Sequence, residues 1–323
     1  MRKHIFILTM ILIILTFPVY AFAEDEASQP EAAVSESYII EGGHWSEDGN
    51  SYFDANGRML TYCVESIDGR LYYFNFLGVK ETFSGWKYVN NNSYWADSNS
   101  VIASSPVKIK EGNKSNVYMF GTDGRLIESK GLFKYEGKEY YGLGDGRLKT
   151  GWVAANNKAM YFNKKSGKTG TLGSMVKGKK IGYLKIPKSG RLGKAYALGI
   201  KQLNKSGWSL RKAYNYSAGL KYKDRFFRTT SSEKYALRGF TKGYGNCYVM
   251  AGTFYIQAKL LGYNVHHIEG RVWGPHSWTV IKHGKKWYVY DPNCTNEVGI
   301  NAYRIWYGKK GTWKYKDYHR IDK

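Results

Sequence analysis

Three polar residues in the C-terminal part of the chain carry side chains that together could perform acyl-transfer chemistry. Cys247 follows Gly-Asn, His276 precedes Ser-Trp, and Asp291 lies between Trp-Tyr-Val-Tyr and proline. A cysteine becomes a strong nucleophile only as a thiolate, which a neighbouring imidazole and a helix N-terminus both stabilise. A carboxylate on the other nitrogen of the imidazole holds the ring in place. The pattern therefore predicts a nucleophile, a base and an orienting acid, in that order.

The segment that begins at Cys247 has the pattern of a buried helix. Asn246 is a good N-cap, Gly262 is a good stop, and apolar residues cover much of the circumference between them. Cys247 then lies in the first turn, where the helix dipole favours an anion. Gly243 and Gly245 would let a substrate approach closely. The alternative is that Cys247 is a small buried hydrophobe, which does not account for the cap or for the downstream histidine and aspartate.

His276 and Asp291 are placed on one surface by the alternation of the strands around them. Residues 277–282 and 287–290 alternate as two strands of a hairpin. A two-residue turn at His283-Gly284 would set His276 directly opposite Asp291, with Cβ atoms about 4.5–5.5 Å apart. A four-residue loop would shift the pair by one cross-strand step and keep both on one face. Either register predicts an imidazole next to a carboxylate.

The first 23 residues have the features of a secretory signal peptide. A basic start at 2–4 is followed by an apolar run from 5 to about 19 and by the small-x-small sequence at 21–23. The cleavage site favours removal, although the run is almost long enough to be an uncleaved anchor. We therefore expect a secreted mature chain without a transmembrane segment. Residues 24–37 are acidic and lack large apolar groups, which is typical of a disordered spacer.

Positive charge is concentrated in the C-terminal part of the chain. Residues 24–191 hold 23 basic and 19 acidic residues, whereas 192–323 hold 24 basic and 7 acidic residues, a net charge of +17. Such a segment should attract polyanions, such as anionic wall polymers or membrane surfaces. Nucleic acid is not expected, because no recognition motif accompanies the charge. A soluble, self-repelling surface is the alternative that charge alone does not exclude.

The remaining cysteines and histidines do not form a second site. No cluster has metal-ligand spacing, so we predict no zinc, no other metal and no cofactor. An odd count of three cysteines in an exported chain predicts at least one free thiol. Cys294 is either a buried thiol or a disulfide partner, and a bridge to Cys63 would leave Cys247 free.

Residues 38–191 repeat a unit in which an aromatic pair is followed by a glycine-containing turn and an apolar residue. The copies begin at Tyr52, Tyr72, Tyr118, Tyr140 and Tyr161. Asn-Gly and Asp-Gly between short aromatic strands are a strong hairpin signal. A period of about 21–22 residues is typical of stacked units that bury their aromatics against neighbours. We predict an all-β hairpin solenoid.

These repeats resemble the cell-wall-binding repeats of Gram-positive surface proteins, of the choline-binding and glucan-binding type. In that family Gly-Trp opens each unit, and Gly85-Trp86 and Gly151-Trp152 match it here. The resemblance implies association with the bacterial cell wall through a glycan or a choline-bearing polymer, which aromatic cages hold by cation–π attraction. The candidate ligand-binding residues are Trp86, Trp152, Tyr140, Tyr141 and Tyr161. For any single aromatic, the alternative is a place in the core of the repeats.

From about residue 192 the pattern becomes helical, with amphipathic helices predicted at 195–203 and 210–222. The segment 223–242 has no clear pattern. Gly-x-Cys, His-x-Trp and Trp-Tyr-Val-x-Asp-Pro are together similar to the motifs of transglutaminase-like cysteine enzymes, over roughly 195–300. The resemblance implies a papain-like α+β domain at 192–323.

The same resemblance implies the roles of the three residues. Cys247 is the nucleophile, His276 the general base and Asp291 the orienting residue, and an amide substrate from a peptide or protein forms a thioacyl intermediate. Water as acceptor would give a peptidase or amidase, and an amine would give a transamidase. The alternative is a non-catalytic wall-binding or glycan-binding surface protein with an inactive transglutaminase-like domain.

Overall fold

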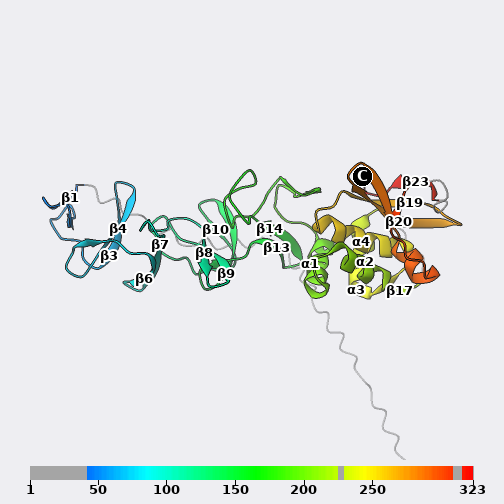
Figure 1. Ribbon diagram of the computed structural model, residues 1–323, viewed down its shortest axis with the longest axis horizontal. Helices are drawn as coiled ribbons and strands as arrows, with labels where there is room; N and C mark the ends of the chain where they lie inside the picture. Colours follow the sequence, from blue (N-terminus) through cyan, green and yellow to red (C-terminus); the bar gives the residue numbers. More distant parts are fainter. Residues whose placement is uncertain (1–41, 225–228, 308–314, 323) are drawn as a thin grey trace, which may run out of the picture.

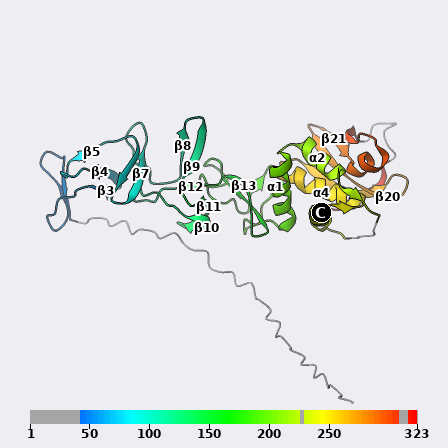
Figure 2. The same ribbon diagram turned by 90° about the horizontal axis from the view of Figure 1, so that it is seen from below.

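The computed structural model describes residues 42–224, 229–307 and 315–322. Over these ranges the chain is elongated, with a row of small β-hairpins followed by a compact α+β part (Figures 1 and 2). The predicted signal peptide and acidic spacer lie outside the described residues. No helix in the described ranges is both long and apolar enough to cross a membrane.

The row consists of antiparallel hairpins that form small sheets. The paired strands are β1 (His44–Trp45) with β2 (Tyr52–Phe53), β3 (Cys63–Ile67) with β4 (Arg70–Phe74) and β5 (Lys80–Glu81), β6 (Gly85–Val89) with β7 (Asn92–Ala96), and β13 (Gly151–Ala155) with β14 (Lys158–Phe162). One larger sheet has the order β10 (Lys130–Tyr135), β11 (Lys138–Leu143), β12 (Arg147–Leu148), β9 (Lys114–Tyr118), β8 (Val107–Glu111). A last short pair is β15 (Lys180–Ile181) with β16 (Leu184–Lys185). The structure thus confirms the predicted hairpins.

The Asn-Gly and Asp-Gly turns follow the aromatic strands as predicted, but they lead only to isolated bridges or to a two-residue strand. The turn that ends at Gly57 follows β2 and leads back to an isolated bridge between Phe53 and Met59. The tight turn of the β6–β7 hairpin is instead Asn90-Asn91, with φ of 46° and 61°. Asparagine tolerates this left-handed conformation better than most residues. The sequence pattern missed the repeat unit whose aromatic pair, Tyr94-Trp95, lies on β7. In the turn that follows this strand, Ser100, with φ of 62°, stands where the other units have glycine.

The C-terminal part combines four α-helices and a five-stranded antiparallel sheet in its described residues. The helices are α1 (Lys194–Ser206), α2 (Leu210–Ala218), α3 (Ser232–Lys242) and α4 (Cys247–Leu260), with a π-helical turn η1 (Cys294–Val298). The sheet order is β22 (Tyr303–Trp306), β21 (Lys286–Tyr290), β20 (Pro275–His283), β19 (Val265–Arg271), β23 (Lys316–Arg320). The short strands β17 (Lys221–Tyr222) and β18 (Tyr244–Gly245) pair in parallel.

The structure confirms the predicted helix α4 and adds a helix that the sequence pattern did not show. Helix α2 stops at Ala218, short of the predicted end, because Gly219 caps it. Helix α3 lies in the segment without a clear pattern. It has an N-cap at Ser231 and a left-handed C-cap at Gly243. Its short buried stripe includes a glycine and a serine, which gave too weak an apolar period to predict a helix.

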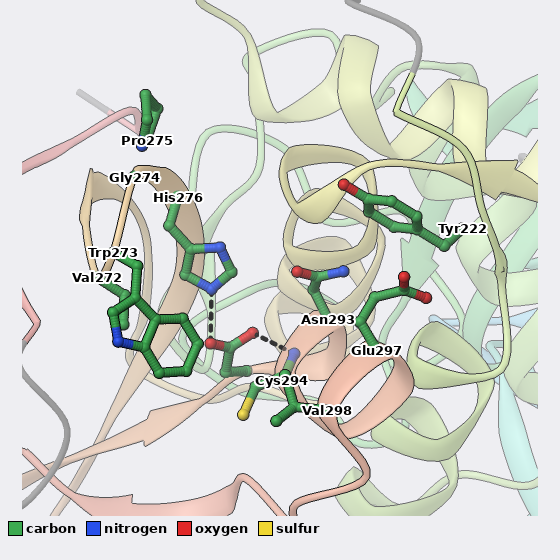
Figure 3. A pocket seen from close by; sticks show the side chains of 11 residues that line it. Tyr222, Val272, Trp273, Gly274, Pro275, His276, Asn293, Cys294, Glu297 and Val298 are labelled. Atoms are coloured by element: carbon green, nitrogen blue, oxygen red, sulfur yellow. Dashed lines mark hydrogen bonds and ion pairs between the residues drawn. The ribbon is translucent and has the colours of Figure 1, made fainter.

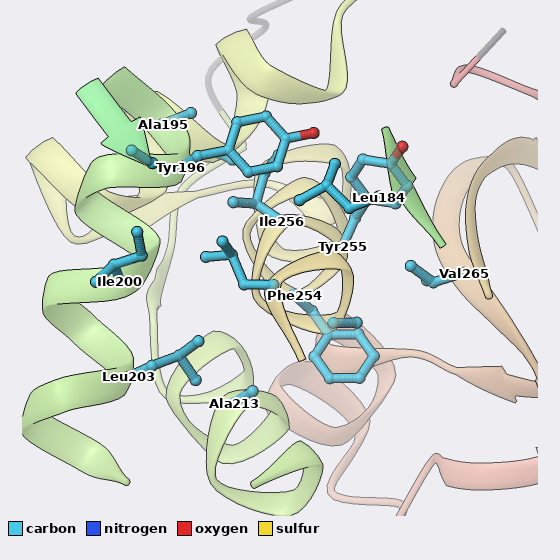
Figure 4. Packing of buried hydrophobic residues seen from close by; sticks show 14 of the residues in the cluster. Leu184, Ala195, Tyr196, Ile200, Leu203, Ala213, Phe254, Tyr255, Ile256 and Val265 are labelled. Atoms are coloured by element: carbon cyan, nitrogen blue, oxygen red, sulfur yellow. The ribbon is translucent and has the colours of Figure 1, made fainter. Parts of the chain in front are cut away.

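Helix α4 is the centre of the C-terminal core. It contacts α1, α2, α3, β19 and β20, and almost all of its residues are buried. Figure 4 shows Ile256 of α4 facing the apolar side chains of α1, and Phe254 of the same helix packs on Tyr214 of α2 and on Tyr290 of β21. The β13–β14 hairpin adds Ala159 to this core, where it forms an isolated bridge with Leu192, and the Trp152 indole N–H donates to the Leu260 carbonyl at 3.0 Å. The domain boundary at 191/192 stays a prediction.

Candidate active site

Cys247 is held at the first residue of α4 by the parallel pairing of β17 with β18. This pairing sets Tyr222 beside Gly245, two residues before the cysteine. The Asn246 side chain accepts a hydrogen bond from the Val249 N–H and caps the helix, as predicted. The Cys247 side chain therefore lies at the positive end of the helix dipole, where a thiolate is stabilised. The residue is 8% exposed.

The two glycines before Cys247 have roles in the backbone and in the packing. Gly243 has φ of 69° and ends α3 in the left-handed conformation. A Cβ atom on Gly245 would overlap the Val249 side chain. The approach of a substrate along these glycines stays a prediction.

The hairpin that carries His276 turns one residue later than predicted. Thr279 pairs with Tyr290 and His283 with Lys286, so the two-residue turn is Gly284-Lys285. Gly284 has φ of 60°, which suits the first position of such a turn. His283 remains in the strand, where its Nε2 contacts the Tyr290 hydroxyl at 2.8 Å. Moving the turn by one residue pairs each residue of β20 with a residue two positions further along β21 than predicted. An even shift keeps every side chain on its face of the sheet, so His276 and Asp291 still share a face.

Asp291 receives hydrogen bonds at both carboxylate oxygens. His276 Nε2 lies 2.7 Å from Oδ2 (Figure 3), and the Tyr315 hydroxyl donates to the same oxygen at 3.0 Å. The Cys294 backbone N–H donates to Oδ1 at 3.0 Å. The Tyr214 hydroxyl donates to the Asp291 carbonyl at 2.9 Å. Asp291 is 1% exposed, so this carboxylate is a rigid, buried orienting group.

The environment of His276 favours the protonated imidazole. Burial by itself lowers the pKa of His276, but the charge and hydrogen bond of Asp291, followed by the hydrogen bond and charge of Cys247, raise it to about 10. Because Asp291 occupies Nε2, Nδ1 is the nitrogen left for the sulfur of Cys247. The arrangement therefore supports a thiolate–imidazolium pair.

Aromatic rings fix the plane of the imidazole. Trp278 stacks on His276 with ring centroids 6.0 Å apart and an interplanar angle of 23°. Tyr315 packs on the indole at 4.6 Å. Trp278 was part of the recognised motif. Tyr315 was missed, because no feature of the sequence connects a tyrosine near the end of the chain with Asp291.

A cleft of about 280 Å³ opens beside His276 and Asp291. Cys247 is not among the residues that line it, although the neighbouring Tyr222 is. Figure 3 shows Asn293, just before η1, and Glu297, on η1, facing Tyr222 across this cleft. The lining residues are Tyr222, Val272, Trp273, Gly274, Pro275, His276, Asp291, Asn293, Cys294, Glu297 and Val298.

The other two cysteines are free thiols in the structure. The Cys63–Cys294 bridge that the sequence left open is therefore not formed. Burial, followed by a nearby carboxylate in each case, raises the pKa of both Cys63 and Cys294 to about 12. Neither thiol has the environment of a nucleophile.

The predicted ligand-binding aromatics have different environments. Trp86 is 43% exposed. Tyr140 is 2% exposed and belongs to the core of its sheet, so its ring offers little surface to a ligand. Tyr141 is half-buried beside Phe162. Trp152 and Tyr161 contact each other with ring centroids 5.0 Å apart and pack against the C-terminal core.

The fold and the site define an α+β domain with a candidate cysteine-dependent acyl-transfer centre. Residues 196–292 match the model of the transglutaminase-like superfamily. The chain therefore contains a transglutaminase-like domain, as its three motifs predicted. A comparison with curated proteins gave no match. In the described residues, no group of three histidine, cysteine or carboxylate side chains is arranged to hold a metal ion.

The N-terminal region is similar to solved structures of choline-binding proteins. Choline binding protein F from Streptococcus pneumoniae, in the presence of a peptidoglycan analogue, is 26% identical over 46% of this chain and 45% of that chain, with a TM-score of 0.27. The modular autolysin LytC from Streptococcus pneumoniae, in complex with a synthetic peptidoglycan ligand, is 19% identical over 44% of this chain and 31% of that chain, with a TM-score of 0.26. This chain thus spans less than half the length of either protein.

Proposed function

We propose that the chain is a secreted, wall-attached cysteine enzyme that cleaves or transfers amide groups through a thioacyl intermediate. The observation that carries the proposal is the environment of His276, which bonds Asp291 at 2.7 Å and whose pKa both Asp291 and Cys247 raise. A histidine in this environment is poised to receive the thiol proton and to pass it to a leaving amine.

The reaction proceeds in two steps, acylation of Cys247 and then transfer of the acyl group to an acceptor. The Cys247 thiolate attacks the carbonyl carbon of an amide, and the new C–S bond forms a tetrahedral anion that backbone N–H groups at the start of α4 stabilise. The C–N bond then breaks, and the imidazolium of His276 gives its proton to the departing amine. Water or a second amine attacks the thioester, transfers a proton to His276 and releases Cys247. Water yields an acid, and an amine yields a new amide.

The hairpin row supplies the attachment in this proposal. We interpret it as a solenoid whose exposed aromatics, with Trp86 foremost, bind a glycan or a choline-bearing polymer of a Gram-positive wall. The net charge of +17 over 192–323 favours a polyanionic wall around the enzyme domain. Peptide stems or surface proteins are then the amide substrates within reach.

Iodoacetamide labelling of the intact chain near pH 7, read by mass spectrometry, tests the activation of Cys247. The other two cysteines serve as internal controls, because burial raises the pKa of each to about 12. Cys63 is more exposed than Cys247. A thiolate at Cys247 would therefore make it react first despite its lower exposure. If Cys63 reacts first, access and not activation governs the rate, and the proposal fails.

Variants separate a catalyst from an inert wall-binding module. We expect Cys247→Ala to abolish amidase and transamidase activity on wall peptides while the fold is retained. Cys294→Ala is the matched control, because it removes a buried thiol near Asp291 and leaves Cys247 in place. His276→Ala should slow the labelling of Cys247 by at least about tenfold. Equal activity in the Cys247→Ala and Cys294→Ala variants would favour the non-catalytic alternative.

A further inference from the structure

The first hairpins form an aromatic box that one of the chain's own lysines fills. The Trp45 ring lies 5.2 Å from Tyr72 at 79° and 6.0 Å from Phe74 at 38°. The Lys80 ammonium lies 4.8 Å from the Trp45 ring centroid and 5.9 Å from that of Tyr72. It also donates to the Gly49 carbonyl at 2.8 Å. The Trp45 box therefore holds a cation by ring contacts and one hydrogen bond.

A second box repeats this ring geometry two hairpins further along the chain. The Trp86 ring lies 5.0 Å from Tyr118 at 75° and 5.8 Å from Phe120 at 39°. Each tryptophan thus meets an edge-on tyrosine and a tilted phenylalanine, with distances and angles close to those of the first box. The two boxes are the same structural device built from different hairpins.

The residue that corresponds to Lys80 in the second box is Leu126. Both residues lie two positions after the glycine of the turn that follows the aromatic strand. The Lys80 N–H donates to the Asn50 carbonyl, and the Leu126 N–H donates to the Ser93 carbonyl. The backbone therefore places the two side chains equivalently, and only one of them carries a charge. Leu126 packs against the apolar cluster that holds Tyr118.

We infer that Lys80 is an internal ligand that closes the Trp45 box, whereas Leu126 leaves the Trp86 box open to an external ammonium group. The side chain at this one position decides whether a box contributes to stability or to binding. The chemical class of ligand is an organic cation without strong hydration, such as a tetraalkylammonium, which gains most from contact with ring faces. The binding role of the Trp86 box depends on the attachment function proposed above. The closure of the Trp45 box depends only on the contacts of Lys80.

The test is a titration of the full-length chain with tetramethylammonium chloride, followed by the indole N–H resonances of Trp45 and Trp86. Phe variants of each tryptophan identify the two signals, and sodium chloride controls for ionic strength. In the wild type we expect the Trp86 signal to shift to saturation and the Trp45 signal to stay unchanged. In Lys80→Leu both signals should shift, with half-saturation concentrations within about tenfold of each other.

Two matched variants and one reverse variant complete the experiment. Lys80→Arg keeps a cation in the Trp45 box and should leave the Trp45 signal silent. Lys87→Leu removes a different lysine, which lies 4.0 Å from the Tyr73 ring centroid, and should also leave it silent. Leu126→Lys should weaken the response of Trp86 by at least about tenfold, because the new ammonium competes for the box.

The outcomes distinguish this inference from the attachment proposal. A Trp45 signal that shifts in the wild type, or that stays silent in Lys80→Leu while Trp86 responds, would overturn the inference and leave the attachment intact. A Trp86 signal that stays silent in the wild type while Trp45 responds in Lys80→Leu would instead remove Trp86 as an attachment site and support the role of Lys80.

Discussion

His276 is the residue at which the chemistry of the site is concentrated. It sits on the face of β20 that meets Asp291, with Trp278 stacked on its ring, and Cys247 is among the groups that raise its pKa. Asp291 in turn is held by the Tyr315 hydroxyl and by the Cys294 N–H. A charged imidazole with these partners stabilises the folded chain.

The raised pKa of His276 makes part of the stability depend on pH. The pKa is about 10 in the folded chain and about 6.5 in an unfolded one. The folded state holds this proton more tightly, so the contribution is complete below about pH 6.5 and is lost as the pH rises through 10. We expect the difference in free energy of unfolding between the wild type and His276→Gln to shrink from pH 7 to pH 10, as measured by urea denaturation.

His319→Gln is the control for this titration. The His319 side chain is 65% exposed and lies outside the candidate site, so His319→Gln controls for the loss of a histidine elsewhere on the sheet. If the gap for His276→Gln stays constant or widens toward pH 10, the imidazolium is not the state that the fold stabilises.

At the scale of elements, the close packing of α3 on α4 positions Cys247. The two helices are joined through Gly243 and β18, so α3 sets where α4 begins. Gly239 of α3 lies against Thr253 of α4, whose hydroxyl donates to the Val249 carbonyl at 2.7 Å. A larger residue at 239 would separate the helices and displace the start of α4.

We expect Gly239→Ala to destabilise the chain by about 1–3 kcal/mol, because its Cβ would overlap the Thr253 hydroxyl. Chemical denaturation of the single variants and of the Gly239→Ala, Thr253→Ala double variant measures the effect. The double variant should lose less than the sum of the two single losses, since removing the hydroxyl relieves the overlap. Strictly additive losses would show that the two side chains are not in conflict.

At the scale of the whole molecule, the hairpin row ends in the core of the transglutaminase-like domain. The Trp152 indole N–H donates to the last turn of α4, and Ala159, Val176 and Leu192 join the apolar cluster around Ile200. Of the two Gly-Trp tryptophans, one is exposed at 43% and the other docks the row onto the transglutaminase-like domain. The hairpin row and this domain are thus connected through a shared core rather than through a polar linker.

Hydrogen exchange of the C-terminal half of α4 tests this docking. Trp152→Ala removes a hydrogen bond worth about 1 kcal/mol together with ring contacts, so exchange near Leu260 should become faster by at least about tenfold. Trp86→Ala is the matched control at the same position of another unit, and it should leave exchange in α4 unchanged. Equal exchange in both variants would mean that the last hairpin does not support the helix.

Local signals were sufficient to predict the helix that begins at Cys247 and the shared face of His276 and Asp291 on the hairpin. The cap at Asn246 and the stop at Gly262 depend on a few adjacent residues. The shared face of His276 and Asp291 survived an error in the turn, because side chains alternate with a period of two and the register moved by two. Helix α3 was missed because its buried stripe is short, and its packing on α4 depends on a glycine whose role is visible only in the folded chain.

The sequence by itself determined which residues are the candidates for catalysis and which local elements carry them, since residue types, caps and alternation are properties of neighbours along the backbone. Only the tertiary structure decided that the Tyr315 hydroxyl bonds Asp291, and that Tyr140 is buried whereas Trp86 is exposed. It also decided that Trp152 contacts α4 and that Lys80 fills the first aromatic box. These outcomes depend on contacts between residues up to 108 positions apart, as between Trp152 and Leu260. Such contacts form through the burial of apolar surface from distant segments, which no local pattern records.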